Sequence, residues 1–129
     1  MILIDTDICI EILRGNKSVI KQRETASEDV AISFMTVAEL FYVAQKSGNL
    51  QKNKTLIDIF LLSVDVIDSD LDIAMKFGEL KSNLEKGGQP VADADLLIAA
   101  IALTKCDKLI TGNSKHFNRF SGLKTENWS

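Results

Sequence analysis

The chain has 129 residues, 46% of them apolar and 26% charged, and a formal net charge of −3. This length predicts one domain over residues 1–129 with a buried core, and the negative charge excludes a protein that binds nucleic acid through a generally basic surface. The longest apolar run, residues 96–103, is far shorter than the roughly 20 residues of a membrane span, so we expect no membrane association.

The N-terminus and the two cysteines indicate the cellular compartment in which the protein is expected. The first apolar run has no basic segment before it, unlike a secretory signal peptide. Cys9 and Cys106 lie in apolar stretches with helical spacing, so we expect buried free thiols, with a disulfide between them as the less favoured alternative. These features predict a protein of the reducing cytoplasm.

The N-terminal half alternates short apolar runs with stretches of helical spacing. Ile2-Leu3-Ile4 and the β-branched run that starts at Val30 predict buried strands. Gly-Asn pairs at residues 15–16 and 48–49 predict helix ends. The expected elements are a strand at 2–5, helices at 7–14 and 17–25, a strand at 30–34 and a helix at 36–46.

The C-terminal half continues the alternation. A helix at 50–62 and an edge strand at 64–67 precede the longest helix, 69–86, which carries an apolar stripe and ends at Gly87-Gly88. The nearly all-apolar stretch 93–104 predicts a buried helix. A strand at 108–111 and a weak last strand at 123–125 complete the chain.

Alternating strands and helices predict a three-layer α/β/α fold with a central, mostly parallel sheet. Ligands of such sheets bind outside the carboxyl ends of the strands. Asp5, Glu39 and Asn113 each follow a predicted strand, and Asp95 lies at the start of a helix that runs antiparallel to strand 108–111. We therefore expect these four side chains at one edge of the sheet.

Carboxylates gathered at one edge need a cation. At an effective dielectric constant of about 20, two unit charges about 4 Å apart repel by roughly 4 kcal/mol. Hard divalent ions such as Mg²⁺ take oxygen ligands, so the pattern favours a metal-dependent enzyme. The single histidine, His116, leaves little material for a histidine zinc site or a Ser-His-Asp triad, and we expect it on a surface loop.

Each acid also has a structural explanation by itself. Thr36 and Glu39 have the spacing of a capping box. Asp93 is a natural N-cap, and Asp5 or Asp7 can cap the first helix. Capping does not require the acids to converge, so their expected convergence favours a shared site.

Four segments resemble, in this order, the motifs of the PIN-domain family, and the end of the chain resembles the closing segment of its VapC-like toxin branch. They are Ile4-Asp5-Thr6-Asp7-Ile8, Ser33-x-x-Thr36-x-x-Glu39-Leu40, Asp95-Leu-Leu-Ile98-Ala99-Ala100 and Leu109-Ile110-Thr111-Gly112-Asn113, followed by Gly122-Leu123-Lys124 and Glu126-Asn127-Trp128. The resemblance covers nearly the whole chain, and the combination is more specific than any one segment.

The resemblance implies a metal-dependent ribonuclease, often acting on tRNA, that is commonly a homodimer and is inhibited by a VapB-type antitoxin whose tail enters the acidic site. By position it assigns Asp5, Asp95 and Glu39 as ligands of Mg²⁺ or Mn²⁺, with Asn113 as a further catalytic position. The auxiliary candidates are Thr6, Asp7, Thr36, Asp93 and Thr111. Among these, Thr6 and Thr111 resemble hydroxyls that support the ligands.

Two positions depart from the family pattern. Many relatives have aspartate where this chain has Asn113, so a tightly bound second metal ion is not implied. Relatives often have asparagine where Asp7 stands, and Asp7 either restores negative charge or caps the first helix. Asp93 competes with Asp95 for the ligand role, and Asp95 is preferred because it directly precedes Leu-Leu-Ile-Ala-Ala.

The implied chemistry is hydrolysis of an RNA phosphodiester, with a metal-bound water as nucleophile and a carboxylate as proton acceptor. Two alternatives stay open. Asp5-Thr6-Asp7 after an apolar strand resembles the nucleophile motif of haloacid-dehalogenase-type phosphatases, but no lysine near a strand end completes that set. The non-enzymatic alternative is a catalytically weak module of the same fold whose acids bind the basic tail of a partner.

Overall fold

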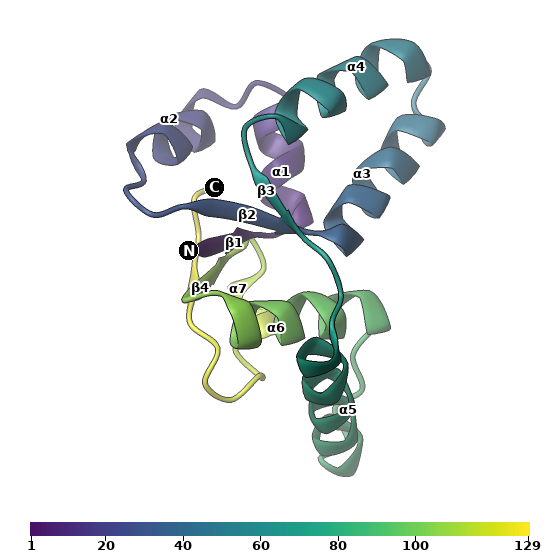
Figure 1. The fold of residues 1–129 in the computed structure, drawn as a ribbon, viewed down its shortest axis with the longest axis vertical. Helices are drawn as coiled ribbons and strands as arrows, with labels where there is room; N and C mark the ends of the chain where they lie inside the picture. The colour runs from purple at the N-terminus through teal and green to yellow at the C-terminus, as the bar shows by residue number, and fades with distance from the viewer.

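The computed structural model describes residues 1–129 as a parallel five-stranded sheet between two layers of helices (Figure 1). The strands are β1 (Ile2–Ile4), β2 (Val30–Ser33), β3 (Asp65–Ile67), β4 (Lys108–Ile110) and β5 (Thr125–Glu126). Their order across the sheet is β3-β2-β1-β4-β5. The predicted α/β/α fold is confirmed, including the edge position of the strand near residue 65.

Seven helices connect the strands: α1 (Thr6–Leu13), α2 (Lys17–Thr25), α3 (Phe34–Lys46), α4 (Leu50–Leu61), α5 (Leu71–Lys86), α6 (Asp93–Lys105) and α7 (Ser114–Phe117). Polar side chains set several of their starts. Asn16, Asn49 and Asp70 each accept a backbone N–H at the start of α2, α4 and α5. These caps explain why the predicted and observed boundaries agree within a few residues.

The caps of two helices differ from the sequence prediction. Helix α3 begins at Phe34 because Ser33 is its N-cap, with Ser33 Oγ accepting from the Thr36 backbone N–H at 2.9 Å. The capping box from Thr36 to Glu39 is therefore wrong. The N-cap of α6 is Ala92, without a side-chain capping bond, so Asp93 as an N-cap is also wrong.

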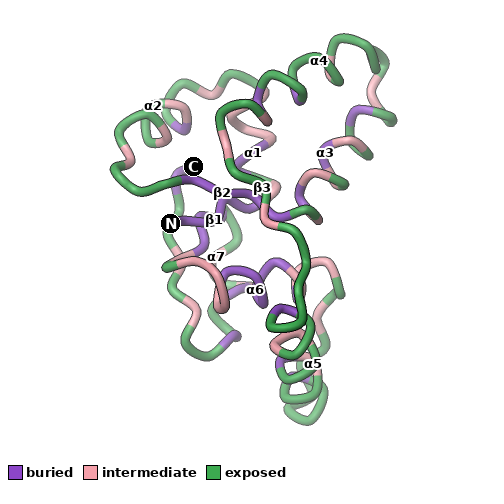
Figure 2. Tube along the Cα trace, viewed as in Figure 1, coloured by how far each residue is buried: buried purple, intermediate pink, exposed green.

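The sheet separates two apolar clusters. Alternate strand side chains point to opposite faces, so Leu3 packs with α5 and α6, whereas Ile2 and Ile4 pack with α1 to α4. Figure 2 shows β1 and β2 buried between the layers. Because both faces are covered, the strands carry continuous apolar runs instead of alternating ones.

Two further expectations concern the free thiols and a membrane-spanning helix. Cys9 is fully buried and Cys106 is half-buried, and neither forms a disulfide, which confirms the free thiols. No helix combines the length and apolar composition that a membrane crossing requires.

Strand β1 is the point where the chain changes direction across the sheet. From β1 it moves outward through β2 to β3, and it then returns to place β4 on the other side of β1. Ligand sites of open α/β sheets lie at this kind of reversal, beyond the carboxyl ends of the strands. A ligand site is therefore expected at the residues that follow β1 and β4.

Candidate functional site

Asp5 follows β1 directly and lies at the centre of this reversal. Its side chain is 7% exposed. Oδ1 accepts the backbone N–H of Thr6 at 2.8 Å, and Oδ2 accepts the hydroxyl of Thr111, the buried residue that follows β4, also at 2.8 Å. Asp5 thus caps α1, as its structural explanation predicted, and also links the ends of two neighbouring strands.

A chain of hydroxyl groups connects Ser33 and Thr36 to Glu39. The Ser33 hydroxyl donates to Thr36 Oγ1 at 3.2 Å, Thr36 and Thr6 hydroxyls are 3.0 Å apart, and Thr6 donates to Glu39 Oε1 at 2.8 Å. Each hydroxyl has one hydrogen. Since Thr6 gives its hydrogen to Glu39, Thr36 must donate to Thr6, so all three hydrogens point toward Glu39.

The segment after β4 completes the network. The backbone N–H of Asn113 donates to Thr111 Oγ1 at 3.0 Å, while Thr111 donates to Asp5. The side chain of Asn113 is exposed and makes no capping bond at the start of α7. Glu39, Thr6, Asp5 and Thr111 are therefore joined by consecutive hydrogen bonds, Asn113 joins them through its backbone N–H, and Asp95 lies outside this chain of bonds.

Asp7 connects α1 to the same segment. Its Oδ1 accepts the Ile8 N–H at 2.8 Å, and its Oδ2 accepts the Gly112 N–H at 2.9 Å. A Cβ atom at Gly112 would lie 2.7 Å from Asp7 Oδ2, so only glycine fits there without displacement. The contacts of Asp7 are those of a residue that holds the loop after β4 against α1.

Asp95 has a partner that the sequence analysis missed. Its Oδ2 lies 2.9 Å from Nε2 of His116, which is on α7 and not on a surface loop. The expectation for His116 is therefore wrong. No local pattern indicated this pair, because the two residues are 21 positions apart and meet only when α7 folds beside the start of α6.

Asp93 lies outside this arrangement. Its side chain is exposed and forms an ion pair with Lys81 of α5, with 2.9 Å between Asp93 Oδ1 and Lys81 Nζ. Asp95, by contrast, is close enough for its charge to act on Asp5. Of the two competing acids, Asp95 is the one that the fold places near the network.

Three acids of the site, Asp5, Asp7 and Glu39, have no basic partner, whereas Asp95 has His116. Burial raises the pKa of Asp5 to about 6 from an ordinary value of 3.8, hydrogen bonds from Thr111 and Thr6 oppose the rise, and the charges of Asp7 and Asp95 add to it. Loss of solvent also raises the pKa of Asp7. No lysine or arginine forms an ion pair with Asp5, Asp7 or Glu39.

These donors suit a divalent cation by their chemistry. No three His, Cys, Asp or Glu side chains are arranged as a preformed metal site. Asp5, Asp95 and Glu39 nevertheless supply only carboxylate oxygens, which Mg²⁺ and Mn²⁺ prefer. The raised pKa of Asp5 means that its negative charge is under-compensated, and a nearby cation would remove that cost.

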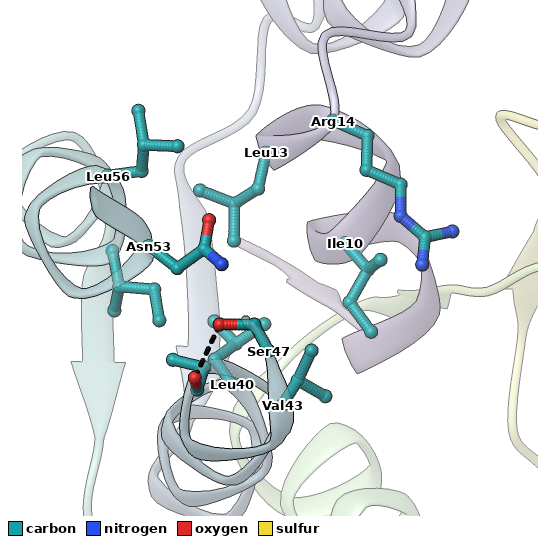
Figure 3. Close-up of a pocket in the computed structure, with 10 residues that line it drawn as sticks. Ile10, Leu13, Arg14, Leu40, Val43, Ser47, Asn53 and Leu56 are labelled. Atoms are coloured by element: carbon teal, nitrogen blue, oxygen red, sulfur yellow. Dashed lines mark hydrogen bonds between the residues drawn. The ribbon is translucent and has the colours of Figure 1, made fainter. Parts of the chain in front are cut away.

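An apolar groove lies between α1, α3 and α4, and two of these helices, α1 and α3, also carry Asp7 and Glu39. Figure 3 shows Ile10 and Leu13 of α1 facing Leu40 and Val43 of α3, with Leu56 of α4 closing the side. The remaining lining residues are Arg14, Ala44, Ser47, Asn53 and Ile57. Because Leu40 is adjacent to Glu39 in α3, the groove begins within one helical turn of the site.

The comparisons with known proteins agree with this architecture. Residues 2–123 match the family model described as PIN domain. The tRNA(fMet)-specific endonuclease VapC of Shigella flexneri is 33% identical over 98% of this chain and 97% of its own length. Ribonuclease VapC2 of Rickettsia felis is 33% identical over 98% of this chain and 96% of its own length.

Solved structures give the same result. The crystal structure of VapBC2 from Rickettsia felis, bound to a DNA fragment from its promoter, contains a chain that superposes with a TM-score of 0.94 at 34% identity, with all of both chains covered. A chain of DNA-bound VapBC from Salmonella typhimurium superposes with a TM-score of 0.93 at 27% identity, covering 99% of this chain and 98% of that one.

Proposed function

This chain belongs to the PIN-domain family, in the branch of the VapC ribonucleases, and from that premise we propose that it is a metal-dependent endoribonuclease and the toxin of a toxin–antitoxin pair. The observation that carries the proposal is the network at the carboxyl ends of β1 and β4. It holds Asp5 and Glu39 by hydroxyl and amide donors and provides no basic residue to neutralise them.

The residues of the site have distinct tasks in RNA hydrolysis. Asp5, Asp95 and Glu39 would hold Mg²⁺ or Mn²⁺, which supplies a water of lowered pKa and offsets charge on the phosphate. Thr111 fixes Asp5, and Thr6 fixes Glu39. Thr6 engages Glu39 Oε1, and Oε2 makes no hydrogen bond within the chain, so Oε2 is the oxygen that is free to bind the cation or to accept the proton of the attacking water.

We further propose structured RNA, and tRNA in particular, as the substrate class, because the named relative from Shigella flexneri is a tRNA-specific endonuclease. The test is incubation of the purified chain with total RNA and with isolated tRNA, in Mg²⁺, in Mn²⁺ and in EDTA, followed by sequencing of the new RNA ends. We expect cleavage that EDTA abolishes.

The control for this test is Asp5→Asn, purified in the same way, which excludes a contaminating nuclease. Equal cleavage by wild type and Asp5→Asn would contradict the proposal. Absence of cleavage with either ion, in protein free of any bound partner, would support the interaction module instead.

The partner that this surface fits is a VapB-type antitoxin with an amphipathic helix followed by basic residues. The apolar groove suits the apolar side of such a helix, and the neighbouring acids suit its basic tail. The toxin chains of the similar solved structures are in complexes named VapBC.

Val43→Asp, in the lining of the groove, should weaken antitoxin binding and leave cleavage intact. Val66→Asp, on β3 and similarly exposed, is the control and should bind as wild type.

We also propose that the chain forms a homodimer through the start of α5. Leu71, Met75 and Phe34 are 82%, 75% and 58% exposed, respectively. They lie beside a hollow whose apolar lining includes Ile73 and Phe77. A protruding apolar group next to an apolar hollow is what a two-fold interface requires. Light scattering should give a dimer for the wild type and a monomer for Met75→Asp, and a monomeric wild type would contradict this assignment.

A further inference from the structure

The contacts of Asp95 are unusual for an acid in the first turn of a helix. Such acids commonly accept backbone N–H groups at the helix start, but α6 has no side-chain capping bond. The hydrogen bond to His116 Nε2, at 2.9 Å, is the only one that the Asp95 side chain makes, and it involves Oδ2 alone. The orientation of Asp95 therefore depends on one residue of another element.

The ring of His116 is itself held in place. It packs edge-on against Phe117, with 5.1 Å between ring centroids and 78° between ring planes. Phe117 is 1% exposed, so this contact anchors the ring to the core. A carboxylate only accepts hydrogen bonds, so the hydrogen of this bond is on Nε2 of His116.

The segment that carries His116 also supports Asp5. Thr111 donates to Asp5 Oδ2, and Asn113, which precedes α7, donates its backbone N–H to Thr111. The backbone N–H of His116 in turn donates to the carbonyl of Asn113 at 3.1 Å. One short segment, residues 111–116, thus places a donor on each of two acids that come from β1 and α6.

We propose that His116 is a positioning residue for Asp95: the Nε2–H bond holds Oδ2 and leaves Oδ1, which makes no hydrogen bond, free to bind a divalent cation. This inference rests on the proposed metal-dependent function. Donors behind metal ligands fix the ligand orientation, and their loss commonly lowers metal affinity by about 10- to 100-fold. The acidic motifs of the sequence do not predict this role for His116, because the contact with Asp95 forms only in the folded chain.

The test compares two substitutions in the full-length chain without RNA. His116→Phe keeps a ring that packs on Phe117 but removes the donor. His116→Gln keeps an N–H donor near the position of Nε2. Mn²⁺ affinity is measured by calorimetry, and the melting temperature is measured in EDTA.

We expect His116→Phe to bind Mn²⁺ about 10- to 100-fold more weakly than wild type, with a melting temperature in EDTA close to that of wild type. His116→Gln should restore most of the affinity. In an Asp95→Asn background, His116→Phe should change Mn²⁺ affinity no further, because His116 acts through Asp95.

Two results would overturn the inference. Wild-type Mn²⁺ affinity in His116→Phe would show that the bond does not position a ligand, and equal losses in the Phe and Gln variants would show that only the imidazole ring itself matters. Both results leave the proposed function intact if wild type still cleaves RNA in an EDTA-sensitive way. If wild type binds no Mn²⁺, both proposals fail together.

Discussion

Acidic residues at the two ends of the sheet have different partners and opposite pKa shifts. At the carboxyl end, Asp5 is held by a hydroxyl and an amide, and its pKa is raised. At the amino end, Asp107 pairs with the terminal amine of Met1 at 2.7 Å, and its pKa is lowered. Another ion pair spans two strands: Lys108, the first residue of β4, pairs with Glu126, the last residue of β5, and the pKa of Glu126 is lowered by that bond.

This difference separates acids that stabilise the fold from acids that are available for chemistry. An acid in an ion pair favours the folded state, because the partner already compensates its negative charge, and a metal ion would gain little by binding it. An acid that is buried beside other acids costs stability in its charged form and is retained for what it binds. The following predictions test whether this contrast holds.

The largest contrast is expected in RNA cleavage. Asp5→Asn removes a proposed metal ligand, so cleavage in Mg²⁺ should be abolished, whereas Asp107→Asn at the other end of the sheet should cleave at the wild-type rate. The measurement is the initial rate on tRNA for the two purified variants. Loss of activity in both, with both folded, would mean that the two ends are not functionally distinct.

The pH dependence of stability should have opposite signs for an acid without a basic partner, Asp5, and an acid in an ion pair, Glu126. The pKa of Asp5 is about 6 in the folded protein and 3.8 ordinarily, so this group favours folding at low pH. The shift of about two units corresponds to about 3 kcal/mol, which is lost as the pH rises from about 4 to about 6. Glu126 has a lowered pKa, so its contribution is lost instead as the pH falls below its ordinary value of 4.5.

Denaturant unfolding in EDTA measures this effect. The free energy of unfolding of Asp5→Asn, relative to wild type, should rise between pH 4 and pH 6 by about 3 kcal/mol, because asparagine stays neutral. A difference that is constant with pH would show that Asp5 is not under-compensated in the folded protein.

A smaller effect is expected from the hydroxyl that supports Asp5. Thr111→Val leaves Asp5 Oδ2 and the Asn113 N–H without their partner. Buried groups left in this way cost about 1–3 kcal/mol of stability, and Mn²⁺ affinity should fall by about 10-fold. Thr104→Val is the control, because the Thr104 hydroxyl binds only carbonyls of its own helix. If both substitutions lowered Mn²⁺ affinity equally, the Thr111 hydroxyl would have no particular role in supporting Asp5.

The smallest effect is expected for the ion pair that links β4 to β5. Glu126→Gln weakens a partly exposed ion pair with Lys108, and exposed pairs contribute little to stability and are weakened by salt. The melting temperature should fall slightly at low salt and match wild type at high salt, with cleavage unchanged. A large decrease that persists in salt would show that this pair has a structural role beyond charge.

Much of the fold could be predicted because the strands and helices here follow local rules. Ile2-Leu3-Ile4 is apolar at every position since both faces of β1 are covered. Helix ends at Gly15 and Gly87 follow from glycine and from the caps. The start of α3 was misplaced because two hydroxyl residues, Ser33 and Thr36, compete for the N-cap and only the packed structure decides between them.

The site was predictable in part. The place of Asp5 and Glu39 at one edge followed from strand ends, but their mutual connection through Thr6 depends on how α1 and α3 pack. Asp95 was preferred over Asp93, and the structure pairs Asp93 with Lys81 instead. His116 was missed because its contact with Asp95 is long-range and leaves no periodic pattern in the sequence.

The central claim is that the carboxyl end of the sheet binds a divalent cation through Asp5, and a thermal shift measures this without RNA. A ligand that binds the folded state raises its melting temperature. Mn²⁺ should therefore raise the melting temperature of wild type and of Asp107→Asn, and leave that of Asp5→Asn unchanged. An equal rise in wild type and Asp5→Asn, or no rise in wild type, would contradict the account.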